Sequence, residues 1–232
     1  MLLEVNDVSS FYGRTPILQN LSLGLEQGQC MCVIGRNGVG KTTLIRTLMG
    51  LTDSATGHII LAGKDIIGLP THVRAAAGLG YVPQGRQIIG NFTVRENILL
   101  GTFAGRTDHN EIPENCLDLF PYLRDNLARR AGLLSGGQQQ QLAIARALAL
   151  NPEILLLDEP TDGIQPNIVR EIGAMLLRLN RELGLTMILT EQHIKVARRI
   201  GHVFILMDNG RVVARGPIAE MTDDLVSTHM SV

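Results

Sequence analysis

Short apolar runs and stretches with helical spacing follow one another along the chain, and this pattern predicts alternating strands and helices. Residues 2–8 and 21–25 alternate apolar and polar side chains, as strands with one buried face do. Residues 30–34 and 154–157 are continuously apolar, which indicates strands buried on both faces. Residues 186–190 read as a further buried strand. The pattern therefore predicts a sheet whose central strands are covered on both sides.

Turn signals separate several other strands. We expect strands over residues 58–63 and 80–84, the second with Pro83 near its exit. Residues 11–13 are expected on the turn that joins the first two strands. Asn209 and Gly210 separate two apolar runs, and Asn-Gly in that setting is a strong hairpin signal.

Helical spacing marks three stretches that alternate with these strands. Residues 43–49 follow a glycine-rich loop, and residues 136–150 follow Ser135, which is a suitable N-cap. Pro166 opens a third helix at its first turn, and apolar residues then mark one face of it as far as Leu183.

The middle of the chain, from about 86 to 150, is predicted to be a helical insert. Strand-like alternation disappears there, and Thr93 with Glu96 predicts a capping box at the start of a helix. Within the insert we expect helices over 94–100 and 112–123, and a loop over 105–108. The whole pattern predicts a single α/β domain over 1–232: a mostly parallel sheet flanked by helices, with antiparallel β elements and a helical subdomain.

Composition is that of an ordinary globular protein, with 45% hydrophobic and 19% charged residues among 232. The formal net charge of −1 gives no electrostatic basis for binding nucleic acid. Cys30, Cys32 and Cys116 form no C-x-x-C pair and are expected to be reduced core residues. No apolar run approaches the length of a bilayer and the first residues carry no basic segment, so neither a membrane span nor a signal peptide is expected.

A glycine-rich loop after the strand at 30–34 fits the phosphate-binding pattern G-x-x-x-x-G-K-[ST]. Its glycines allow backbone N–H groups to point at phosphates, and the positive end of the following helix adds to that field. Lys41 is expected to reach the β- and γ-phosphates of a nucleotide, and the Thr42 hydroxyl to bind Mg²⁺. The candidate nucleotide-binding residues of this loop are Gly35, Arg36, Asn37, Gly38, Val39, Gly40, Lys41, Thr42 and Thr43.

Two acids, Asp158 and Glu159, end the apolar strand that lies far downstream of this loop. In phosphate-loop NTPases an acid in that place holds the Mg²⁺ shell, which suits Asp158. Glu159 is then free to face the γ-phosphate, where a carboxylate can orient and polarise an attacking water.

A second candidate phosphate site lies at Ser135, Gly136, Gly137 and Gln138. A serine and two glycines at a helix start offer unhindered N–H groups, a hydroxyl and a helix dipole. Because the first loop already serves one nucleotide, this second loop is expected to serve a nucleotide bound to another copy.

Together these stretches resemble the ATP-binding-cassette (ABC) family over nearly the whole chain. Residues 35–43 look like the Walker A loop, 154–158 like Walker B, and 134–138 like the LSGGQ signature. The resemblance implies that Tyr12 stacks on adenine. It also implies that Gln84 senses Mg²⁺ and the γ-phosphate.

The same resemblance implies that Glu159 is the catalytic glutamate. It further implies two cassettes packed head to tail, as a homodimer or as a heterodimer with a second ABC ATPase. Two ATP molecules would lie between them, and hydrolysis would drive two transmembrane permease subunits. The chain would then sit on the cytoplasmic face of the membrane and serve an external solute-binding protein indirectly.

Two positions depart from the family pattern. Gln165 stands where the loop after Walker B usually carries an aspartate. The switch histidine should follow the strand at 186–190 by two positions, where Gln192 falls and His193 comes one later. We favour Gln192 as the switch residue, with His193 as the alternative if the register slips. A glutamine can hydrogen-bond a phosphate or water but cannot take up a proton at neutral pH.

The departures also resemble a subfamily. Glu191-Gln192 after the strand resembles importer ATPases for branched-chain amino acids, and the glutamines at 138–141 most resemble the ATPase subunit of urea uptake systems. We therefore expect an importer ATPase for a small polar solute: urea, short amides or branched-chain amino acids. A soluble non-transport ABC ATPase and a regulatory cassette are the alternatives.

Overall fold

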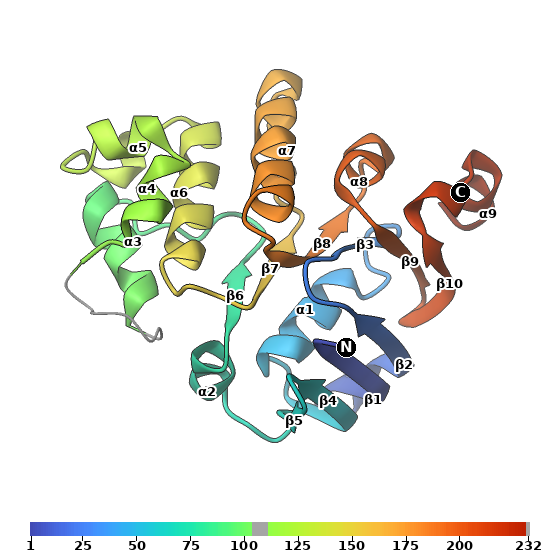
Figure 1. Ribbon diagram of the computed structural model, residues 1–232. Helices are drawn as coiled ribbons and strands as arrows, with labels where there is room; N and C mark the ends of the chain where they lie inside the picture. Colours follow the sequence, from blue (N-terminus) through green and yellow to red (C-terminus); the bar gives the residue numbers. More distant parts are fainter. Residues whose placement is uncertain (104–110, 231–232) are drawn as a thin grey trace.

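The computed structural model describes residues 1–103 and 111–230, whose strands form two sheets (Figure 1). In the larger, six-stranded sheet, β9, β3, β8, β7 and β6 run parallel, while β10 is antiparallel to β9. This agrees with the predicted, mostly parallel sheet. From edge to edge its strands are β10 (Arg211–Pro217), β9 (Val203–Asp208), β3 (Cys30–Ile34), β8 (Thr186–Glu191), β7 (Ile154–Asp158) and β6 (Leu79–Val82).

The smaller sheet is antiparallel and contains the first strands of the chain. Its strands, in spatial order, are β2 (Thr15–Leu25), β1 (Leu3–Tyr12), β4 (Ser54–Leu61) and β5 (Lys64–Asp65). The turn predicted at residues 11–13 is correct only for Gly13, because β1 continues until Tyr12 pairs with Thr15. Only Gly13 and Arg14 remain for the turn, and Gly13 has the left-handed backbone (φ +57°) that a tight hairpin requires.

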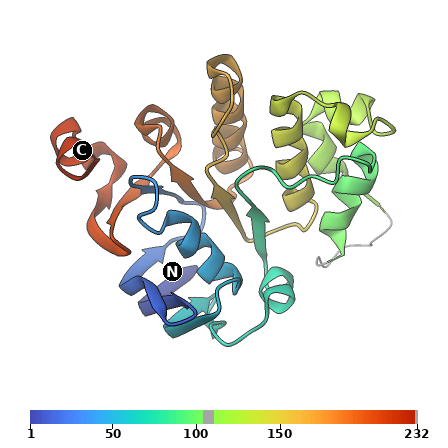
Figure 2. The same cartoon turned by 180° about the vertical axis from the view of Figure 1, so that it is seen from behind.

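Helices lie on both faces of the six-stranded sheet. Figures 1 and 2 show α1 between the two sheets, while α7 and α8 lie on the opposite side of the larger sheet. The helices are α1 (Lys41–Met49), α2 (Thr71–Ala76), α3 (Val94–Thr102), α4 (Glu114–Asp118), α5 (Pro121–Asp125), α6 (Gly136–Leu148), α7 (Pro166–Arg181), α8 (Ile194–Ile200) and α9 (Asp223–Met230), with short 3-10 turns at Ala131–Leu133 and Ile218–Glu220. Within residues 1–103 and 111–230, no helix combines the length and the apolar character needed to cross a bilayer.

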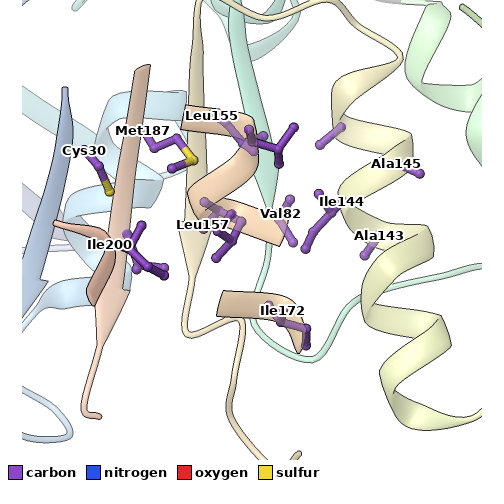
Figure 3. Packing of buried hydrophobic residues seen from close by; sticks show 14 of the residues in the cluster. Cys30, Val82, Ala143, Ile144, Ala145, Leu155, Leu157, Ile172, Met187 and Ile200 are labelled. Carbon is purple, nitrogen blue, oxygen red and sulfur yellow. The ribbon is translucent and has the colours of Figure 1, made fainter. Parts of the chain in front are cut away.

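Two hydrophobic cores share the six-stranded sheet. In β7, Ile154 and Leu156 pack into the core on the α1 side, whereas Leu155 and Leu157 pack into the core on the other side. Figure 3 shows Leu155 and Leu157 in the second core, together with Ile144 of α6. Successive residues of a strand point to opposite faces, so a strand apolar at every position is covered on both sides, as predicted.

The helices α3 to α6 gather at one end of the molecule (Figure 1). The capping box predicted at Thr93 and Glu96 is confirmed at the start of α3. The single helix predicted over 112–123 is wrong: α4 and α5 are separate, because Pro121 has no N–H to continue the first of them. The loop predicted at 105–108 lies outside the described residues.

Candidate functional site

The site is built where three neighbouring parallel strands end. β8 lies between β3 and β7, so the carboxyl ends of all three meet at one edge of the sheet. The register pairs Ile34 of β3 with Glu191 of β8, and Thr190 of β8 with Asp158 of β7. The glycine-rich loop, the two acids and residue 192 are thereby brought together from distant parts of the sequence.

The glycine-rich loop is held in shape by the β9–β10 hairpin. A Cβ atom at Gly35 would lie 2.6 Å from the carbonyl oxygen of Met207, so no larger residue fits there. The N–H of Gly210, from the predicted Asn-Gly turn, donates to the carbonyl of Val39 at 2.9 Å. Gly40 has φ +107° and is the N-cap of α1, so the helix begins at Lys41 rather than at the predicted Thr43.

Lys41 is buried at the centre of the site, where its side chain is 3% exposed. Its Nζ donates to the carbonyls of Gly35 and Arg36 at 2.9 and 3.0 Å and forms an ion pair with Oε1 of Glu159 at 3.0 Å. The ammonium group is thus fixed between the loop and the second acid. A cation in this place suits the phosphates of a nucleotide.

Asp158 has one satisfied and one unsatisfied oxygen. Its Oδ1 accepts hydrogen bonds from the hydroxyls of Thr42 at 3.1 Å and Thr190 at 2.8 Å. Its Oδ2 is buried and has no hydrogen-bond partner among the described residues. Burial raises the pKa of Asp158, and the hydrogen bonds from Thr190 and Thr42 oppose that shift. A buried carboxylate oxygen beside a threonine hydroxyl fits Mg²⁺, which prefers oxygen ligands.

Glu159 is the point where the groups of the site converge. Besides Lys41, its carboxylate accepts hydrogen bonds from Nε2 of Gln84 at 3.3 Å and Nε2 of Gln192 at 2.8 Å, both on Oε2. Its backbone is left-handed (φ +46°), and its N–H donates to the Thr190 hydroxyl at 2.9 Å. A left-handed backbone at a residue other than glycine is strained, and such strain often occurs at functional sites.

These side chains border a cavity of about 470 Å³. Predicted site residues account for most of its lining, and two further residues, Ile17 and Asp162, were not predicted. Asp162 accepts a hydrogen bond from Nε2 of Gln84 at 3.1 Å. The predicted residues that line the cavity are Tyr12, Asn37, Gly38, Gly40, Lys41, Thr42, Thr43, Gln84, Glu159 and Gln192.

Tyr12 of β1 lines the cavity, as does Ile17 of β2. The Cζ atom of Arg46 lies 5.6 Å from the centroid of the Tyr12 ring. If the ring stacks on adenine, Tyr12→Ala is expected to weaken ATP binding about tenfold, because stacking on one base contributes roughly 1–3 kcal/mol. Tyr12→Phe keeps the ring and is expected to bind as the wild type does. Equilibrium binding of a fluorescent ATP analogue measures both, and equal affinity of the two variants would contradict the assignment.

The signature residues Ser135, Gly136, Gly137 and Gln138 do not line this cavity. They begin α6, where Ser135 and Gln138 form a capping box. Ser135 and Gly136 are exposed. A Cβ atom at Gly137 would lie 2.5 Å from Cγ2 of Ile168, which explains the glycine there. This second loop therefore lies apart from the first within one chain.

The structure separates the two candidates for the switch residue. The side chain of Gln192 contacts Glu159 inside the cavity. His193 is the exposed N-cap of α8 and lines a different hollow, between α7 and α8, together with Ile164 and Val169. This geometry favours Gln192. Gln165 is the N-cap of α7 and lies outside the cavity lining.

Together, the buried lysine, the paired acids and the glycine-rich loop define a P-loop nucleoside triphosphatase site. A family model described as ABC transporter matches residues 18–162. The chain belongs to the ABC transporter family and is an ATP-binding ATPase cassette.

Relatives agree with this assignment along nearly the full chain. The high-affinity branched-chain amino acid transport ATP-binding protein BraG of Pseudomonas aeruginosa is 38% identical over 213 residues, which cover 91% of each protein. The probable branched-chain amino acid transport ATP-binding protein LivF of Archaeoglobus fulgidus is 34% identical, over 96% of this chain and 94% of its own length. The dimeric structure of a post-hydrolysis ATP-binding cassette bound to ADP and Pi has a TM-score of 0.81 and 29% identity, over 93% of this chain and 98% of that chain.

Proposed function

We propose that this chain is the ATP-hydrolysing subunit of an importer for a small polar solute. The observation that carries the proposal is the convergence of Lys41, Gln84 and Gln192 on the carboxylate of Glu159, inside the cavity beside the glycine-rich loop. Such a cluster brings together a cation that can bind phosphate, two amide groups that can form hydrogen bonds with phosphate or water, and a carboxylate that can orient and polarise a water molecule.

In this proposal, Lys41 exchanges the Glu159 carboxylate for the β- and γ-phosphate oxygens of ATP. Glu159 is then free to accept a hydrogen bond from the attacking water and to polarise it. Gln192 donates a hydrogen bond to Glu159 through its amide but cannot take up a proton at neutral pH, so the carboxylate is the chief catalytic group. Thr42, Asp158 and Gln84 would hold Mg²⁺, which would supply positive charge that offsets the negative charge on the phosphates.

We infer that Ser135 to Gln138 act on ATP held by a second cassette, either another copy or a related ATPase chain. Their exposed position, apart from the cavity of their own chain, supports this. The dimeric state of the similar cassette with ADP and Pi supports it as well.

The importer would contain two transmembrane permease subunits that hold this chain at the cytoplasmic face of the membrane. A solute-binding protein would deliver solute to them from outside. Ile89, Phe92 and Leu133 are large apolar side chains that remain 39%, 39% and 67% exposed, beside the helices at one end of the molecule. Exposed apolar side chains of this kind favour a docking surface for a partner.

The solute is proposed to be urea, a short amide or a branched-chain amino acid. The names of the two relatives support the last of these, and the glutamines at 138–141 support urea through resemblance. In cells that lack this chain, uptake of labelled urea and labelled leucine should identify the solute. Wild type is expected to restore uptake of one of them, and Glu159→Gln is expected not to restore it. If neither uptake depends on the chain, this choice of solutes is wrong.

A further inference from the structure

Glu191, the last residue of β8, is a carboxylate with 1% exposure that makes no ion pair within the described part of the chain. A charged group is costly to bury unless hydrogen bonds satisfy its oxygens. Oε1 of Glu191 accepts from the hydroxyl of Thr161 at 2.7 Å. Oε2 accepts from the N–H groups of Gln192 at 3.2 Å and His193 at 3.3 Å. Both oxygens are therefore committed to neighbouring groups.

These partners belong to two different loops, and Glu159 lies in the first of them. Thr161 is buried, 1% exposed, and follows Glu159 in the loop after β7. Gln192 follows β8, and its side chain donates to Oε2 of Glu159 at 2.8 Å. β7 and β8 lie side by side in the sheet (Figure 1), so one carboxylate joins the loops that leave both strands.

We propose that Glu191 is a positioning residue for ATP hydrolysis: it fixes the backbone of residue 192 and the loop at Thr161, and thereby holds the Gln192 amide against Glu159. The inference rests on the proposed catalytic role of Glu159. Burial raises the pKa of Glu191 above its usual value, and the hydrogen bonds from Thr161, His193 and Gln192 oppose that shift only in part. Small displacements of a catalytic group slow a reaction more than they weaken substrate binding.

If Glu191 acts through its hydrogen bonds, two substitutions of this residue should have different effects on turnover. Glu191→Met has a similar length but accepts no strong hydrogen bond, so it releases all three donors. Glu191→Gln removes the charge but can keep the geometry: its oxygen can accept from the two N–H groups, and its NH₂ can donate to the Thr161 hydroxyl. A role through charge or proton transfer would be lost in both variants, whereas a positioning role is lost mainly in the first.

The test compares steady-state ATP hydrolysis by these two variants with that of the wild type. We expect Glu191→Met to lower kcat by about tenfold or more, with the KM for ATP changed less than about twofold. Glu191→Gln is expected to keep most of the wild-type kcat. Wild-type kcat in Glu191→Met, equal losses in both variants, or a change confined to KM would each overturn the proposal.

A second pair of variants decides the question if Glu191→Met does not fold. Thr161→Ser keeps the hydroxyl that donates to Glu191, and Thr161→Val removes it at nearly constant volume. Thr161→Val is expected to lower kcat several-fold relative to Thr161→Ser, and equal kcat in the two variants would overturn the proposal. Glu159→Gln separates the failures: if that variant keeps its turnover, the proposed function fails; if it loses turnover while the Glu191 and Thr161 variants do not, only the positioning role fails.

Discussion

Glu159→Gln is expected to lower the kcat of ATP hydrolysis by about 10²–10⁴-fold, which is the usual contribution of a positioned general base. Lys41, Gln84 and Gln192 all contact the carboxylate of Glu159. Glutamine keeps nearly the same shape and can still accept a hydrogen bond from Lys41, but it is a much weaker base. ATP binding is expected to persist, because the glycine-rich loop and Lys41 are unchanged.

Phosphate release under saturating ATP measures the turnover of this variant, and a fluorescent ATP analogue measures its affinity. Glu171→Gln is a matched control, because Glu171 is an exposed residue of α7 outside the cavity lining. The control is expected to hydrolyse ATP at the wild-type rate. Unchanged turnover in Glu159→Gln would remove Glu159 from the mechanism.

Lys41→Met is expected to lower the free energy of unfolding of the nucleotide-free protein by about 3–5 kcal/mol, the usual cost of removing one partner of a buried ion pair. The side chains of Lys41 and Glu159 are 3% and 8% exposed, so the substitution leaves a carboxylate buried without its cation. Adding Glu159→Gln removes that charge. The double variant is therefore expected to be more stable than the sum of the two single effects predicts.

Urea unfolding of the wild type, both single variants and the double variant gives the coupling free energy of the pair. Lys64→Met is a suitable control, since Lys64 is an exposed residue of β5. Strictly additive effects of Lys41→Met and Glu159→Gln would show that the two charges do not stabilise each other in the absence of nucleotide.

Local patterns identified those parts of the site that depend on neighbouring residues in the chain. The strand, glycine loop and helix around Lys41 form one continuous segment. Asp158 ends a strand whose preceding residues are all apolar, and Glu159 follows directly. The capping box at Thr93 and Glu96 follows from residues three positions apart, whereas at Ser135 only the N-cap was predicted and its capping box with Gln138 was not. Spacing and residue type alone were sufficient for these predictions.

Other features depend on how distant strands align. Gln192 rather than His193 contacts Glu159 because of the register between β7 and β8. The residues of a single strand do not reveal that register. Tyr12 remains in β1 because of its cross-strand partner, Thr15. Asp162, in the loop after β7, accepts a hydrogen bond from Gln84, in the loop after the neighbouring strand β6.

Buried polar residues at the end of an apolar strand could have indicated further residues of the site, but they were not used in the predictions. Thr190 and Glu191 end the apolar run of β8, and both form hydrogen bonds with the loop that contains Glu159 and Thr161. The break between α4 and α5 could likewise have been inferred from Pro121 alone.

The left-handed backbone of Glu159 sets a limit on how the thermal tolerance of this protein can be improved. Glycine adopts that conformation without a steric penalty, but Glu159→Gly would also leave Lys41 buried without its ion-pair partner, so relieving the backbone strain removes the ion pair at the same time. Such a variant would lack the carboxylate on which the catalytic proposal depends. Engineering for heat resistance should therefore leave this position fixed and draw its gains from residues remote from the cavity.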